Sequence, residues 1–76
     1  MDADMVRMVN QIADFFDAYP EAEAAPMVAE HIRNFWPPTM RADLARLLDM
    51  PLAADLKPLA RDGARLAVGQ PAATPD

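Results

Sequence analysis

The chain has 76 residues and no cysteine, which excludes disulfides, thiolate nucleophiles and sulfur-ligated zinc sites. Its formal net charge of −5, from twelve acidic and seven basic residues, argues against nucleic acid as the principal ligand, because phosphate binding requires a cationic surface. A chain of this length forms one small domain that buries only about 60% of its unfolded surface, so we expect it to gain stability from a partner subunit.

The first predicted helix follows Asp2 and Asp4, either of which can cap its N-terminus. Apolar residues then recur at three- and four-residue steps and cover one face about 120° wide. They are Met5, Met8, Val9, Ile12, Phe15, Phe16 and Tyr19. Phe15 and Phe16 are the largest apolar groups of this face, so we expect both in the core. Tyr19-Pro20 ends the helix.

Two prolines shape the second predicted helix. Pro20 with the following acidic residues is typical of a helix start, but Pro26 removes one intrahelical hydrogen bond. We favour one helix from about Pro20, bent near residue 22, over a helix that begins near Ala25. Its expected apolar face consists of Ala25, Val28, Ala29, Ile32, Phe35 and Trp36.

A rigid corner follows this helix, and we expect the rest of the chain to be organised around it. Pro37 and Pro38 cannot continue the helix, and Thr39 is the predicted N-cap of a third helix that starts near Met40. The single tryptophan, Trp36, lies at the corner. Its side chain either seals the core, anchors a partner protein, or does both.

The third predicted helix ends near Asp49 and carries Met40, Leu44, Leu47 and Leu48 inward. Asp55 is the predicted cap of a short fourth helix, with an apolar stripe of Leu56, Leu59, Leu66 and Val68. Gly63 is expected to weaken this helix by about 1 kcal/mol relative to alanine. Gly69 marks its C-cap.

The predicted fold class is therefore all-α, a small bundle of three helices with a weaker fourth. The helical domain covers residues 1–69, and residues 70–76 read as a disordered tail because they have nothing to bury. No apolar run approaches the roughly 18 residues of a membrane span. The N-terminus lacks the basic and apolar regions of a secretory signal, so we expect a cytoplasmic protein.

No residue pattern predicts catalysis, cofactor binding or a metal site. His31 is the single imidazole, and Glu30 points about 100° away around the helix, so the two cannot act as a pair. We interpret His31 as a boundary residue beside Met27 and Phe35, with a partner contact as the alternative. The acidic residues Asp14, Asp17, Glu21 and Glu23 lack the spacing of a calcium-binding loop.

Arginines flank the aromatic corner, and arginine and tryptophan often dominate protein interfaces. The predicted partner-interface residues are Phe35, Trp36, Met40, Arg33, Arg41 and His31.

Two sequence blocks resemble a known family. Residues 8–16 fit M-x-N-Q-I-A-x-F-F, and residues 31–41 fit H-I-x-x-F-W-x-P-x-M-R, with Tyr19-Pro20-Glu21 between them. They resemble the small delta subunit of NAD-dependent formate dehydrogenases over about residues 5–48. Pro37 departs from the family pattern, which has a polar or acidic residue there.

The resemblance implies a cofactor-free accessory subunit that is not itself an enzyme. In that family, larger subunits with a molybdenum or tungsten pterin, iron-sulfur clusters and flavin oxidise formate. The delta subunit helps to assemble, stabilise or load the pterin-carrying subunit. We therefore expect this large subunit as the partner. The alternative is a free-standing helical adaptor or regulatory homodimer without an enzyme partner.

Overall fold

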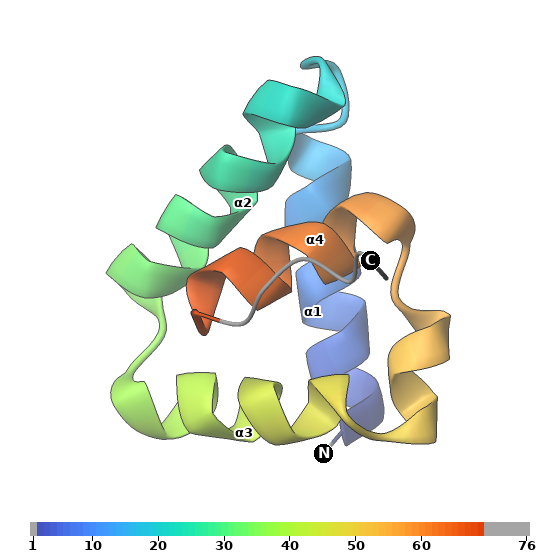
Figure 1. The fold of residues 1–76 in the computed structure, drawn as a ribbon, viewed down its shortest axis with the longest axis vertical. Coiled ribbons are helices and arrows are strands. Elements are labelled where there is room, and N and C mark those ends of the chain that lie inside the picture. Colours follow the sequence, from blue (N-terminus) through green and yellow to red (C-terminus); the bar gives the residue numbers. More distant parts are fainter. Residues whose placement is uncertain (1, 70–76) are drawn as a thin grey trace, which may run out of the picture.

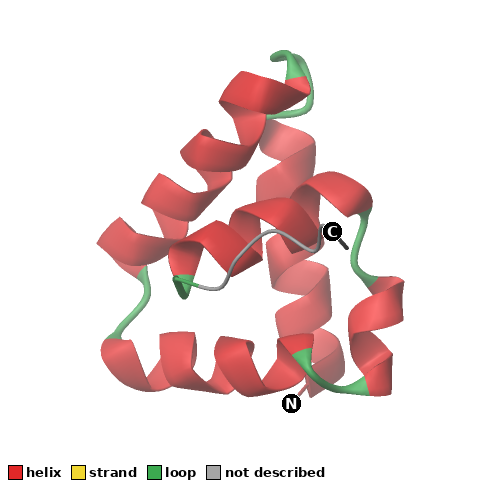
Figure 2. Ribbon diagram, in the orientation of Figure 1, coloured by secondary structure: helices red, strands yellow, loops and turns green. Residues whose placement is uncertain are grey.

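The computed structural model describes residues 2–69, and all its regular structure is helical (Figure 2). Its elements are α1 (Asp2–Phe15), α2 (Glu21–Phe35), α3 (Pro38–Leu48), the 3₁₀ helix η1 (Pro51–Asp55) and α4 (Pro58–Ala67). The all-α prediction is confirmed. The 3₁₀ helix was not predicted, and the predicted tail lies outside the described residues.

The helix expected to be weakest, α4, lies at the centre of the fold. In Figure 1, α1 and α2 form two sides of a triangle, α3 forms the third side, and α4 crosses between them. The most extensive helix contact is between α2 and α4, and α4 also contacts α1 and α3. The fourth helix is therefore the element on which the other three assemble.

Small residues line the inner side of α4. They are Ala60, Gly63, Ala64 and Ala67, all buried. The predicted stripe of larger residues was wrong only at Leu66, which is 39% exposed. Leu59 and Val68 pack half-buried against the core, and buried Leu56 precedes the helix. A Cβ atom on Gly63 would lie 2.5 Å from the Cβ of Val28 and 3.3 Å from the carbonyl oxygen of Ala25. Glycine at this position allows α4 to lie close against α2.

Proline determines where the helices begin. Helix α2 runs through Pro26 as one element, which confirms a single helix from about Pro20 and excludes a start near Ala25. The bend near residue 22 stays a prediction. Pro20 is its N-cap, and the Pro20 carbonyl accepts hydrogen bonds from the amides of Glu23 and Ala24 at 2.9 and 2.8 Å. The second helix therefore begins directly after the turn that closes α1.

Two predicted caps were wrong. Helix α3 begins at Pro38, with Pro37 as N-cap and Thr39 inside the first turn, because the fixed φ of proline suits the first helical position. Helix α4 begins in the same way at Pro58, after Lys57, while Asp55 ends η1. Proline thus starts both helices without a side-chain cap. At the end of α4, Gly69 adopts a φ of 77° just beyond the C-cap residue Val68.

The core lies where α4 meets the other helices. Its fully buried larger side chains are Val9, Val28, Ile32, Leu44 and Leu47, and Trp36 joins them at 7% exposure. Met40 is half-buried against this core, as predicted for the third helix.

The expected core positions Phe15 and Phe35 were wrong, since their side chains are 79% and 72% exposed. Each lies at the edge of its predicted apolar face. In α1, smaller residues such as Val6 and Ala13 are buried instead.

Asn10 ties α1 to the segment that leads into α4. Its Nδ2 donates to the carbonyl oxygen of Asp55 at 3.1 Å, and the amide of Lys57 donates to its Oδ1 at 2.9 Å. One turn further along α1, Asp14 pairs with the Nζ of Lys57 at 2.6 Å. These contacts set the position from which α4 starts across the bundle.

The first prediction concerns Gly63. Although alanine has the higher helix propensity by about 1 kcal/mol, Gly63→Ala should destabilise the domain by about 1–3 kcal/mol, because its methyl group overlaps Val28. Urea unfolding followed by circular dichroism measures the change. The loss should shrink in a Val28→Gly background, because glycine at position 28 lacks the Cβ and Cγ atoms that the new methyl group would overlap. A Gly63→Ala protein as stable as the wild type contradicts the close packing of α2 on α4.

The second prediction concerns Asn10. Asn10→Ala should lower the free energy of unfolding by about 1 kcal/mol, because two backbone groups lose their partner at a partly solvated site. Gln11→Ala, at an exposed neighbouring position, is the matched control and should leave stability unchanged. Equal urea midpoints for the two variants would show that the Asn10 contacts are dispensable.

Candidate partner-binding surface

Aromatic side chains gather on one surface formed by the end of α1, the following turn and α2. This surface, which we call the aromatic surface, consists of Phe15, Phe16, Tyr19, His31 and Phe35. It holds four of the five aromatic residues of the chain, together with its single histidine. Phe15, Tyr19 and Phe35 are 79%, 48% and 72% exposed, and the other two are half-buried.

The rings of the aromatic surface contact one another in a continuous series. Phe15 packs edge-to-face on Phe16, with ring centroids 5.0 Å apart. Phe16 lies 6.4 Å from Tyr19 and 6.3 Å from His31, and His31 lies 4.8 Å from Phe35. These separations are those of favourable aromatic pairs. The exposed rings are therefore held by their neighbours, although water reaches them.

The aromatic surface is hollowed, with a volume of about 320 Å³ beside Phe16, Tyr19, His31 and Phe35. The α2 residues that line the hollow follow helical spacing: Met27, Glu30, His31, Asn34 and Phe35. The buried positions of α2, such as Val28 and Ile32, do not line the hollow. The hollow therefore opens on a face of α2 that the core leaves free.

The six predicted interface residues do not form one surface. Phe35 and His31 belong to the aromatic surface. Trp36 belongs to the core, which answers the question of whether its side chain seals the interior. Arg33, Met40 and Arg41 lie elsewhere.

Arg33 is exposed, and its Nη2 donates to the carbonyl oxygen of Leu66 in α4 at 3.0 Å. Arg41 is half-buried and lines a separate hollow between α3 and the end of α4. Met40 packs against the core. Arg33 thus links α2 to α4, and Met40 contributes to the packing of α3.

Sequence reasoning missed Phe15 and Tyr19 as exposed residues, because their spacing fits a core face. Phe16, also expected in the core, packs half-buried against it. A signal was present: Phe15 and Phe35 both lie at the edge of a predicted apolar face, where burial depends on how far the neighbouring helix reaches.

His31 lies inside the aromatic surface. Its ring lies between the rings of Phe16 and Phe35. Within residues 2–69, no group of three or more histidine, aspartate or glutamate residues is placed to hold a metal ion. The same part of the chain contains no helix long and apolar enough to cross a membrane.

Comparison with known proteins identifies the family. The family model of the NADH-dependent formate dehydrogenase delta subunit, FdsD, matches residues 4–64. No curated protein and no solved structure gave a match to the chain. The family match runs from α1 into α4 and so extends past the two sequence blocks that carry the resemblance. The chain therefore belongs to the NADH-dependent formate dehydrogenase delta subunit family.

Proposed function

We propose that this chain is a non-catalytic accessory subunit that binds the large pterin-carrying subunit of a formate dehydrogenase through its aromatic surface. Membership of the delta subunit family supports the association with a formate dehydrogenase complex. The observation that carries the proposal is the exposure of Phe15, Tyr19 and Phe35 on one surface. Contiguous exposed apolar surface on a small domain marks an interaction site.

The chemistry of the aromatic surface suits a protein partner. Aromatic side chains are enriched at protein interfaces and have few rotatable bonds, so they lose little entropy on binding. The contacts of Phe16 with Phe15 and of His31 with Phe35 hold these rings before a partner arrives. The hollow beside them accepts a protruding side chain, and Glu30 and Asn34 at its border offer hydrogen bonds.

Binding also supplies the stability that so small a domain lacks. A partner present at a hundredfold excess over its dissociation constant stabilises the folded state by about 2.7 kcal/mol. We propose that the reciprocal effect on the large subunit favours a conformation competent for assembly or pterin loading. We place this event in the cytoplasm, in keeping with a chain that has no cysteine.

Association with the large subunit tests the proposal directly. Phe35→Ser and Phe15→Ser should each weaken co-purification with that subunit, with a dissociation constant raised about 10- to 100-fold, as expected for exposed aromatic anchors. Met50→Ser is the matched control, because Met50 is 40% exposed but lies outside the aromatic surface. Undiminished binding by both phenylalanine variants, or an aromatic surface that mediates a stable homodimer in sedimentation, contradicts the proposal.

A further prediction separates the roles of two adjacent residues. Trp36→Ala should lower the free energy of unfolding by about 3–5 kcal/mol, because it removes a buried core side chain. Phe35→Ser should change it by less than about 0.5 kcal/mol, because that ring already faces water. Urea unfolding of the isolated chain measures both values. A Phe35→Ser variant that unfolds would assign Phe35 to the fold and remove it from the interface.

A further inference from the structure

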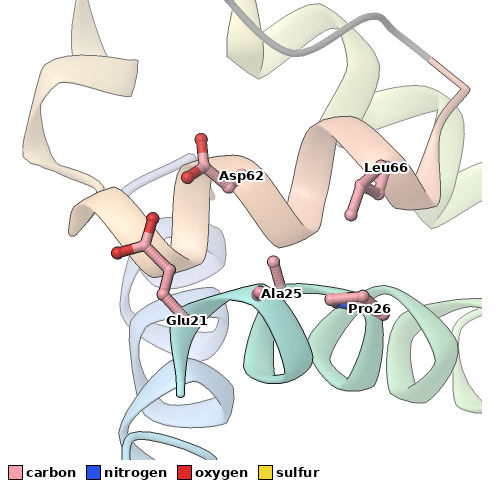
Figure 3. Close-up of a pocket in the computed structure, with 6 residues that line it drawn as sticks. Glu21, Ala25, Pro26, Asp62 and Leu66 are labelled. Atoms are coloured by element: carbon pink, nitrogen blue, oxygen red, sulfur yellow. The ribbon is translucent and has the colours of Figure 1, made fainter.

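A second concave surface lies between α2 and α4. This α2–α4 groove has a volume of about 400 Å³ and is lined by Glu21, Ala22, Ala25, Pro26, Asp62 and Leu66 (Figure 3). It differs from the aromatic surface in its residues and in its helices, since α4 forms one wall and α1 contributes none of the lining. Helix α2 therefore borders both the groove and the hollow of the aromatic surface.

The middle and one end of the α2–α4 groove are apolar. Ala22, Ala25 and Pro26 come from α2, and Leu66 comes from α4. In Figure 3, the Leu66 side chain extends from α4 toward α2, above Ala25 and Pro26. Leu66 remains 39% exposed, so its contacts within the domain leave much of the side chain open to an aliphatic group from outside.

The other end of the groove offers hydrogen-bond acceptors. Glu21 and Asp62 lie together there, on facing helices (Figure 3). Neither carboxylate forms an ion pair or a side-chain hydrogen bond with any other residue of 2–69. Pro26 has no N–H, so the carbonyl of Ala22 lacks the donor that an uninterrupted helix supplies. No side chain that lines the groove carries a donor.

Charged residues around the groove add to the difference between its acidic end and its apolar end. A neighbouring hollow shares Glu21 and adds Asp14 and Asp17, so negative charge continues past the acidic end. Lys57, the basic residue of that hollow, is already paired with Asp14 at 2.6 Å. Beyond the apolar end, Arg33 donates to the carbonyl oxygen of Leu66. These two cations are thus engaged within the domain, and the two carboxylates of the groove are not.

We infer that the α2–α4 groove binds a segment of a partner protein that presents an aliphatic side chain next to an arginine or lysine. The aliphatic group packs between Leu66 and Pro26, and the cation donates to Glu21 and Asp62. Charge-assisted hydrogen bonds to two carboxylates favour a basic residue over a neutral one. The inference rests on the proposed function for the identity of the complex, and it adds a second contact of different chemistry to the aromatic one.

Photo-crosslinking in the assembled formate dehydrogenase complex tests this inference. A p-benzoylphenylalanine placed at position 66 reports on the groove, and one placed at position 35 reports on the aromatic surface. We expect position 66 to crosslink to a peptide of another subunit that contains a basic residue beside an aliphatic one. Combining Glu21→Gln with Asp62→Asn should lower this yield about tenfold while the yield from position 35 stays constant.

Glu23→Gln is the matched control, because Glu23 is an exposed acid of α2 that does not line the groove, and it should leave both yields unchanged. The inference about the groove is overturned if position 35 crosslinks but position 66 does not. It is also overturned if the captured peptide lacks a basic residue, or if removing the two carboxylates has no effect. In these cases the proposed function stands. Failure of both positions to crosslink to any other subunit overturns the two together.

Discussion

The close approach of α4 to α2 at Gly63 and Val28 is the constraint on which the rest of the structure depends. A single Cβ atom on Gly63 would collide with Val28, so the separation of the two helices is set by the absence of that atom. Only small side chains fit between helices that lie so close together. Alanines accordingly make up most of the buried face of α4. The large rings of Phe15 and Phe35, at the edges of their helices, lie outside this tight interior. They contact neighbouring rings of the aromatic surface instead.

At the corner after α2, two neighbouring residues lie in opposite environments. Phe35 is the last residue of the helix and faces water, whereas Trp36 has left the helix, adopts an extended conformation with φ −99° and ψ 131°, and enters the core. The extended Pro37 then allows α3 to begin at Pro38 in a new direction. The two prolines thus determine the direction in which the chain leaves α2. The buried Trp36 side chain holds this corner against the core. The same turn leaves the Phe35 ring next to His31, where the aromatic surface ends.

Much of this fold follows from local sequence, because proline, glycine and apolar spacing act over a few residues. The break at Pro37 and Pro38, the inward leucines of α3 and the continuous second helix were all predictable on these grounds. The importance of α4 was not, since Gly63 lowers helix propensity locally and its benefit appears only when Val28 lies opposite. The aromatic surface was not predictable from the sequence for a related reason. Whether Phe15 is buried depends on the reach of another helix, which helical spacing does not encode.

Helix α2 combines three environments around its circumference, and two of them are the surfaces proposed to bind a partner. Its Val28 side meets α4, its His31 side carries aromatic rings, and its Pro26 side borders the acidic groove. Pro26 weakens the helix in isolation by removing a hydrogen bond, yet it also supplies an apolar wall and leaves the Ala22 carbonyl for a partner. A domain of this size has little stability to spare for such a feature. Packing against α4 on one side and a bound subunit on the others would hold the helix, so the proline that disfavours α2 alone becomes compatible with it in the complex.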